Sequence, residues 1–145
     1  MPAEAQTIHP VLTKEEVATF LDRAFPHSPR AERGEIETLS PGRLRINLDP
    51  VARMQRPGNI VSGPTQMALA DHAAYAVILA HVGLKEMAVT NALSIVFLRA
   101  CQFERLVADA TLLKLGRRLV TVDVRLWQQN EARMIAQATI GYALP

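Results

Sequence analysis

The segment formed by residues 62–82 constrains the fold more than any other part of the chain, because it is apolar almost all round. Its only formally charged side chain is Asp71. Ser62 is a favourable N-cap, Pro64 suits the first turn and Gly83 is a typical stop, so the sequence predicts a helix of about 20 residues and roughly 30 Å. A helix that is hydrophobic on every side is expected to be buried, so the remaining chain must enclose it.

Asp71 is the unusual residue of this predicted helix. A carboxylate in an apolar environment is costly unless it is paired, hydrogen-bonded or directed into a cleft. From the helix alone, Asp71 is therefore either a buried structural acid or a catalytic acid or base, and both interpretations remain open at this point.

The rest of the chain has the patterns of a short amphipathic helix and several strands. Thr13 and Glu16 match a capping box, which predicts a helix that ends before Pro26, and residues 49–62 are expected to form a loop. Strands are predicted at residues 36–39, 44–48, 88–98, 106–114, 119–127 and 133–142.

The order of these elements is one short helix, two strands, one long helix and four strands. Strands and helices do not alternate, so the sequence predicts an α+β protein with an antiparallel sheet wrapped around the long helix, which is the hotdog arrangement. We expect an N-terminal leader and short helix over residues 1–33, followed by one hotdog domain over residues 34–145.

Composition narrows the range of functions. The net charge is only +2 and the few aromatic residues do not alternate with a basic stripe, so nucleic acid is not an expected partner. Cys101 is the only cysteine, and neither an apolar leader nor a membrane-spanning run occurs, so we expect a cytoplasmic protein that does not contact membranes. No cluster of residues has metal-ligand spacing and no glycine-rich phosphate loop is present, so neither a metal nor a cofactor is expected.

Several motifs resemble those of the PaaI-like hotdog thioesterases, a family that hydrolyses acyl-CoA thioesters, over about residues 34–145. A glycine in that family precedes an aspartate by eight residues, as Gly63 precedes Asp71 here. The other matching motifs are Leu69-Ala70-Asp71, Val89-Thr90, Phe97-Leu98-Arg99 and Leu115-Gly116-Arg117-Arg118-Leu119.

The chain departs from the pattern of the family at two points. The His-Gly-Gly motif is replaced by Ser62-Gly63-Pro64, so the histidine is missing. The family often has an asparagine seven residues before the first glycine, where this chain has Arg56, and Asn59 is only four residues before it.

The resemblance implies a role for each of four catalytic candidates. Asp71 would act as a general base or as a nucleophile, and the Gly63 N–H would bind the oxyanion at the start of the helix. Thr90 would place a hydroxyl near the attacking water, and Asn59 would orient substrate or water. The structural alternatives are a helix-entry glycine at Gly63, an ordinary strand residue at Thr90 and a turn residue at Asn59.

Four further residues are candidates for substrate binding. Ser62 would replace the missing histidine, as an N-cap or through its hydroxyl. Arg99, Arg117 and Arg118 would bind the phosphates of CoA, although such charges more often form a solvated face.

The expected protein is thus a metal-independent acyl-CoA thioester hydrolase. The resemblance implies a homodimer or homotetramer in which Asp71 of one chain faces Gly63 of another. Two alternatives remain, which are an acyl-CoA-binding domain without catalysis and, less favoured because the histidine is missing, a hotdog hydratase or dehydratase.

Overall fold

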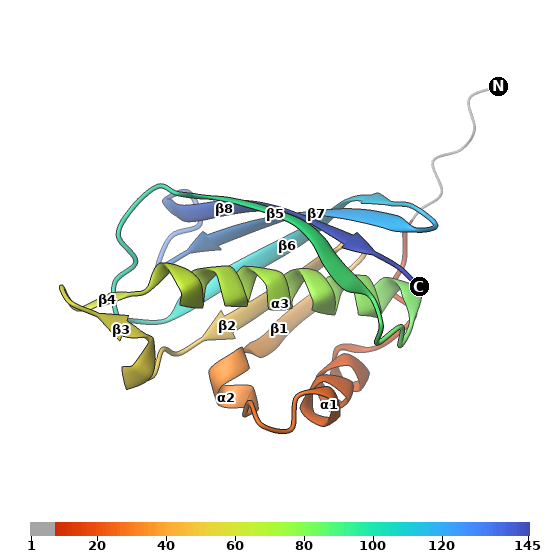
Figure 1. Ribbon diagram of the computed structural model, residues 1–145, viewed down its shortest axis with the longest axis horizontal. Coiled ribbons are helices and arrows are strands. Elements are labelled where there is room, and N and C mark those ends of the chain that lie inside the picture. The colour runs from red at the N-terminus through yellow and green to blue at the C-terminus, as the bar shows by residue number, and fades with distance from the viewer. Residues whose placement is uncertain (1–7) are drawn as a thin grey trace.

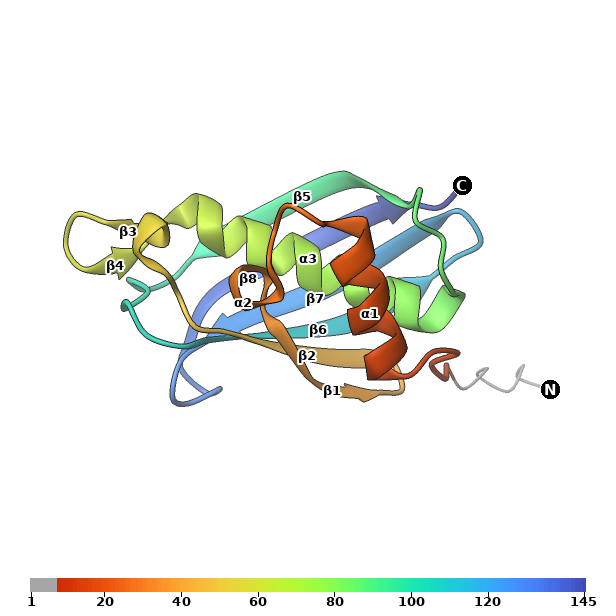
Figure 2. The same ribbon diagram turned by 90° about the horizontal axis from the view of Figure 1, so that it is seen from below.

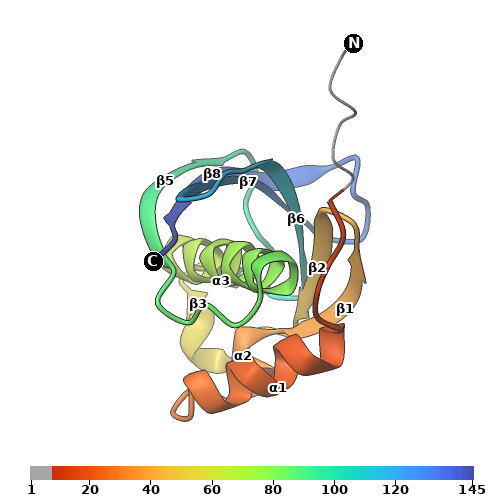
Figure 3. The ribbon, with the colours of Figure 1, turned by 90° about the vertical axis from the view of Figure 1, so that its right-hand side faces the viewer.

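The computed structural model describes residues 8–145, so the first seven residues of the expected leader lie outside the described part of the chain. Helix α3 (Gly63–Val82) lies in the concave side of an antiparallel six-stranded sheet with the strand order β1-β2-β6-β7-β8-β5. Figures 1 and 3 show the sheet curving around this helix, and Figure 2 shows α1 and α2 on the side that the sheet leaves open. The predicted α+β class and hotdog fold are confirmed.

Helix α3 forms where its sequence signals predict. The Ser62 hydroxyl accepts a hydrogen bond from the Thr65 N–H at 3.3 Å, and Pro64 occupies the first turn. The helix ends at Gly83, whose φ of 94° is accessible to glycine without steric cost. Every residue from Ala73 to His81 is buried, which agrees with the apolar character of the segment.

The strands of the sheet are β1 (Glu35–Ser40), β2 (Arg43–Leu48), β5 (Val89–Phe97), β6 (Leu106–Leu115), β7 (Leu119–Trp127) and β8 (Met134–Ala143). Alternate residues of β7 and β8 are buried against α3, as their period of two predicts. Because β5 pairs with β8 alone and stands at the end of the strand order, one of its backbone edges has no partner strand among residues 8–145.

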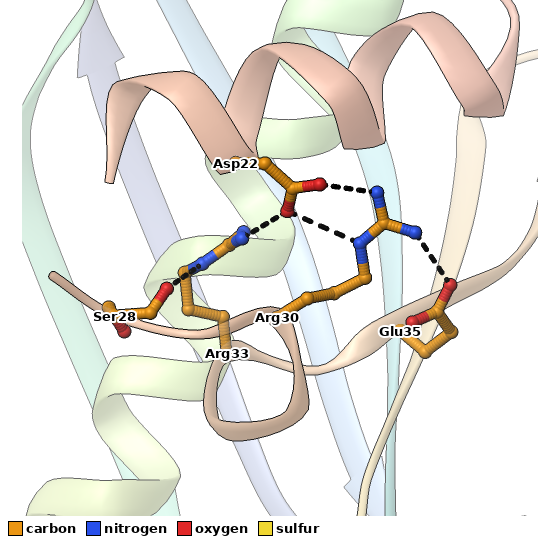
Figure 4. Close-up of polar contacts among 5 residues, drawn as sticks. All are labelled: Asp22, Ser28, Arg30, Arg33 and Glu35. Carbon is orange, nitrogen blue, oxygen red and sulfur yellow. Dashed lines mark hydrogen bonds and ion pairs between the residues drawn. The ribbon is translucent and has the colours of Figure 1, made fainter. Parts of the chain in front are cut away.

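The N-terminal part packs on the same core. Helix α1 (Lys14–Ala24) has the predicted capping box between Thr13 and Glu16. A short helix α2 (Arg30–Arg33), which no sequence pattern predicts, follows it. Figure 4 shows how Asp22 of α1 joins both Arg30 and Arg33 of α2, so this ion-pair cluster fixes α2 against α1.

The segment before α3 is more ordered than a plain loop. It contains a 3-10 turn η1 (Ala52–Met54) and a small hairpin of β3 (Gln55–Arg56) and β4 (Ile60–Val61). The Ser62 N–H donates to the carbonyl of Met54 at 2.9 Å, which fixes the direction in which the chain enters α3. None of the helices within residues 8–145 is long and apolar enough to cross a membrane.

Candidate functional site

Asp71 is held by two hydroxyl groups that come from separate strands. Its Oδ1 accepts hydrogen bonds from Thr90 Oγ1 of β5 at 2.8 Å and from the Tyr142 hydroxyl of β8 at 2.7 Å. No hydrogen bond to Oδ2 occurs within residues 8–145. The side chain is thus fixed through one oxygen while the second remains available, as a base or a nucleophile requires.

Tyr142 is a component of this site that the sequence analysis does not single out. Its side chain is 4% exposed, and its ring stacks on Tyr75 of α3 with centroids 6.0 Å apart. Burial above all, together with the neighbouring Asp71 carboxylate, raises the pKa of Tyr142, so the phenol remains a protonated donor at neutral pH. A buried tyrosine hydroxyl needs a hydrogen-bond partner, and the position of Tyr142 on the inward face of its strand is the sequence signal that points to it.

Gly63 presents a free backbone N–H at the start of α3. Of the first four helical positions, Pro64 has no N–H, the Thr65 N–H donates to Ser62 Oγ, and the Gln66 N–H donates to the Ser62 carbonyl at 3.2 Å. No acceptor for the Gly63 N–H occurs within residues 8–145. The positive end of the helix dipole adds to the field of this donor, so the position suits a developing oxyanion.

The glycine at position 63 also allows a close approach. A Cβ atom built there would lie 3.4 Å from Cζ of Phe97, so even a methyl group would fill the space between the helix start and this ring. The φ angle of Gly63 is ordinary, so its backbone conformation does not require glycine, and an added methyl group would be in van der Waals contact with the Phe97 ring.

Gly63 and Asp71 lie too far apart to act on one carbonyl group within a single chain. Eight residues of helix separate them along the axis by about 12 Å. The two groups also belong to opposite ends of β5, since Gly63 lies beside Phe97 and Asp71 bonds to Thr90.

Two cavities flank the first turn of α3. The first, of about 460 Å³, contains two arginines beside Gly63, and its lining includes Arg56, Gly63, Gln66, Phe97 and Arg99. The second, of about 400 Å³, is bounded by α1, α2, η1 and α3. Its apolar part is lined by Phe25, Leu48, Met54, Ala68 and Leu69, and the charged Glu32, Arg33 and Arg53 also line it.

A third cavity, of about 730 Å³, lies over the outer face of the sheet and away from α3. Most of its charged groups pair with one another. Arg45 pairs with Asp109 at 2.6 Å, Trp127 donates to the same carboxylate, and Arg125 pairs with Asp123. We therefore do not regard this face as the candidate site.

The remaining candidate residues from the sequence lie at different distances from Gly63 and Asp71. Arg99 lines the cavity beside Gly63, and its Nη1 donates to the Met134 carbonyl at 2.6 Å. Arg117 and Arg118 follow β6 at the end of the sheet where β5 begins, which is the end near Asp71. Asn59 is exposed in the β3–β4 turn with a φ of 57°, and Gln55 donates to its side chain, so within one chain it does not meet Asp71.

Two histidines of α3 do not form a dyad with Asp71. His81 Nδ1 lies 2.7 Å from the Val77 carbonyl, and its Nε2 accepts the Gly42 N–H at 2.9 Å, so it fastens the β1–β2 turn. His72 lines the apolar cavity instead, and burial, with a smaller effect of Arg33, lowers its pKa to about 4.

Neither the single cysteine nor a cluster of metal-binding side chains contributes a further reactive group in the described residues. Cys101 is buried, and burial raises the pKa of its thiol to about 12, so it is not an activated nucleophile. Within residues 8–145 no group of three or more histidine, cysteine, aspartate or glutamate side chains is arranged to hold a metal ion.

Comparisons with known proteins identify the family to which this fold belongs. The fold defines a hotdog protein. A family model described as the thioesterase superfamily matches residues 58–135. A crystal structure from Silicibacter sp. TM1040, provisionally described as a thioesterase, is 35% identical with a TM-score of 0.86, over 97% of this chain and 96% of that one. The chain belongs to the thioesterase superfamily.

More distant structures share the fold. The E. coli PaaI protein from the phenylacetic acid degradation operon is 21% identical with a TM-score of 0.73, over 90% of this chain and 94% of that one. The protein smu.793 of Streptococcus mutans UA159, solved with bound acetyl CoA, is 20% identical with a TM-score of 0.69, and the match covers 77% of this chain and 88% of that one. No curated protein matches the chain significantly.

Proposed function

We propose that the protein hydrolyses acyl-CoA thioesters at a site formed between two copies of the chain. The observation that carries the proposal is Asp71, whose carboxylate is fixed through Oδ1 by Thr90 and Tyr142 and has a second oxygen available. A member of the thioesterase superfamily with this acid and a free N–H at the start of the same helix has both groups that thioester hydrolysis needs.

The edge strand β5 supplies the reason for two copies. Val89 and Val96 on this strand are 54% and 53% exposed, and a long apolar edge is a template for pairing with another strand. If β5 pairs antiparallel with its own copy about a two-fold axis, the Phe97 end of one strand lies beside the Thr90 end of the other. Gly63 of one chain then approaches Asp71 of the second.

In the proposed reaction, Asp71 accepts a proton from water, and the water oxygen bonds to the thioester carbon. Negative charge builds on the carbonyl oxygen, which accepts a hydrogen bond from the Gly63 N–H. The C–S bond then breaks, the sulfur leaves with the electron pair and takes the proton back, and the products are the free acid and CoA. In the nucleophilic variant, Asp71 itself attacks, CoA leaves, and water hydrolyses the resulting anhydride.

The two cavities beside the first turn suggest the direction in which the substrate lies. Arg56 and Arg99 on one side suit the phosphates of CoA, and the apolar cavity on the other side suits the acyl group. The Streptococcus mutans neighbour with bound acetyl CoA supports this ligand class. Arg117 and Arg118 would reach CoA only from the second copy, because they lie at the Asp71 end of the sheet.

A screen of CoA thioesters from acetyl to long-chain and aromatic acyl groups tests the proposal, with release of the thiol as the readout. Turnover of at least one class is expected. Binding of acyl-CoA without any turnover would instead favour the acyl-CoA-binding domain, the alternative that the Ser62 and Pro64 departures support. Label in the Asp71 carboxylate after single turnover in H₂¹⁸O would identify the nucleophilic route with water attack at the aspartyl carbon of the anhydride, because a general base does not exchange its oxygens in the reaction.

A further inference from the structure

Gln66 is a buried polar residue in the first turn of α3 that the proposed reaction does not use. Its side chain is 4% exposed, and its Nε2 donates to the Val61 carbonyl at 3.3 Å. Its Oε1 is shielded from solvent and has no hydrogen-bond partner within residues 8–145. Buried polar atoms without a partner are rare in folded proteins, and each one calls for an explanation.

The orientation of this amide is determined by its one hydrogen bond. Exchanging Nε2 and Oε1 would place a carbonyl oxygen against the Val61 carbonyl, and the only hydrogen bond would be lost. Oε1 is therefore the atom that faces away from Val61. It can only accept hydrogen bonds, so its missing partner must be an N–H or O–H donor.

The surroundings of Gln66 indicate the donor. Gln66 lines the cavity of about 460 Å³ together with Gly63, Arg56 and Arg99. In the proposed function, Gly63 binds the thioester carbonyl and the arginines bind phosphate. The part of a CoA thioester that connects these groups is the pantetheine arm, whose first amide N–H is two carbon atoms from the sulfur.

We infer that the first turn of α3 shifts when a CoA thioester binds and uncovers Gln66 Oε1, which then accepts a hydrogen bond from this first amide N–H of the pantetheine arm and so sets the position of the thioester over Gly63. The inference rests on the proposed function, because it takes a CoA thioester as the ligand. Gln66 is on this account a binding residue that selects thioesters of acylated cysteamine over thioesters that lack the amide.

Matched small thioesters test the inference. The wild-type protein is assayed with two thioesters of the same acyl group, one on N-acetylcysteamine and one on O-acetylmercaptoethanol. The two substrates differ only in that the amide N–H of the first is an ester oxygen in the second. We expect kcat/KM for the amide to exceed that for the ester by about five- to tenfold, the effect of one hydrogen bond. The variant Gln66→Met, similar in length but without an amide, should lose this preference.

The exposed glutamine Gln55, outside the lining of the cavity, provides the matched control, and Gln55→Met should keep the preference. Calorimetric binding of CoA itself gives a readout that does not depend on turnover, and Gln66→Met should bind CoA about fivefold more weakly. Thermal unfolding shows whether each variant is folded.

Equal use of the two substrates by the wild type would overturn the inference, and so would an unchanged preference in Gln66→Met. A dimer structure in which the second copy donates to Gln66 Oε1 would overturn it as well. An equal loss for both substrates would assign Gln66 to the attacking water instead. If the wild type hydrolyses no thioester at all, the proposed function fails, while the CoA-binding comparison still decides the role of Gln66.

Discussion

Replacing Asp71 by asparagine tests the proposed acid with the smallest possible change in shape. The asparagine carbonyl oxygen can still accept the hydrogen bonds that Thr90 and Tyr142 now donate at 2.8 and 2.7 Å. The amide nitrogen would occupy the position of Oδ2, where it can neither accept a proton at neutral pH nor attack a carbonyl carbon. We therefore expect Asp71→Asn to fold and to lose turnover.

The structure sets the size of the two effects. Hydrogen bonds to a charged acceptor contribute about 1.5–3 kcal/mol and neutral ones about 1 kcal/mol, so two weakened bonds cost about 1–3 kcal/mol at most. The lower desolvation cost of a neutral amide offsets part of this loss. Removal of a general base slows the reaction about 10²–10⁴-fold, which corresponds to about 3–5 kcal/mol in the activation free energy.

Thiol release and thermal unfolding are then measured on the same preparations, with Thr90→Val and Tyr142→Phe as companions. Each companion removes one donor and keeps the carboxylate, so we expect a smaller loss of rate than in Asp71→Asn. If Asp71→Asn turns over within a few-fold of the wild type, Asp71 is a structural acid. A companion that is as inactive as Asp71→Asn while fully folded would show that the hydroxyls, rather than the free carboxylate oxygen, carry the chemistry.

Light scattering should show a dimer or a larger oligomer at micromolar concentration, and a fully active monomer would refute the shared site. Arg99→Ala should weaken acyl-CoA about two- to fivefold and reduce its salt dependence, while acyl-pantetheine, which lacks the nucleotide, should be unaffected. The stability of the fold should decline as the pH falls from about 6.5 to about 4, by up to about 3 kcal/mol, because His72 has a lower pKa in the folded than in the unfolded state; denaturant unfolding of His72→Gln should show a shallower decline. Ala68→Phe should lower kcat/KM for long acyl groups but not for acetyl-CoA, and equal losses would place the acyl group elsewhere.

The parts of the fold that the sequence predicts are those with a long, regular pattern. Helix α3 carries its cap, its proline and its terminating glycine within one segment, and β7 alternates over its whole length. Such elements are specified locally, so they can be predicted without knowledge of their neighbours. Short elements carry too few residues for a pattern, which is why the sequence predicts neither α2 nor the β3–β4 hairpin.

The site is harder to predict because its contacts are long-range. Tyr142 lies 71 positions after Asp71, and only the register of β8 brings its hydroxyl to the carboxylate. The unpaired oxygen of Gln66 is likewise a property of packing, since the sequence shows only a glutamine in an apolar helix. The sequence singles out Asp71 and Thr90 as candidates, whereas the contact of Tyr142 with Asp71 follows from the order of strands in the sheet.

The motif Ser62-Gly63-Pro64 shows how the departure from the His-Gly-Gly pattern changes the chemistry available to the helix start. Proline removes one of the first amide donors, and Ser62 accepts hydrogen bonds from the next two, the Thr65 N–H through its side chain and the Gln66 N–H through its carbonyl. Gly63 is left as the free donor of this turn within residues 8–145, so in the proposed reaction a single backbone N–H of this turn would face the oxyanion. Because loss of an oxyanion donor costs about 10²–10³-fold in rate, an efficient enzyme with this motif needs a second donor from elsewhere. In the proposed dimer, Gly63 faces the second copy's Asp71, whose Thr90 and Tyr142 hydroxyls already donate to the carboxylate, so we expect the second donor to be another group of that copy.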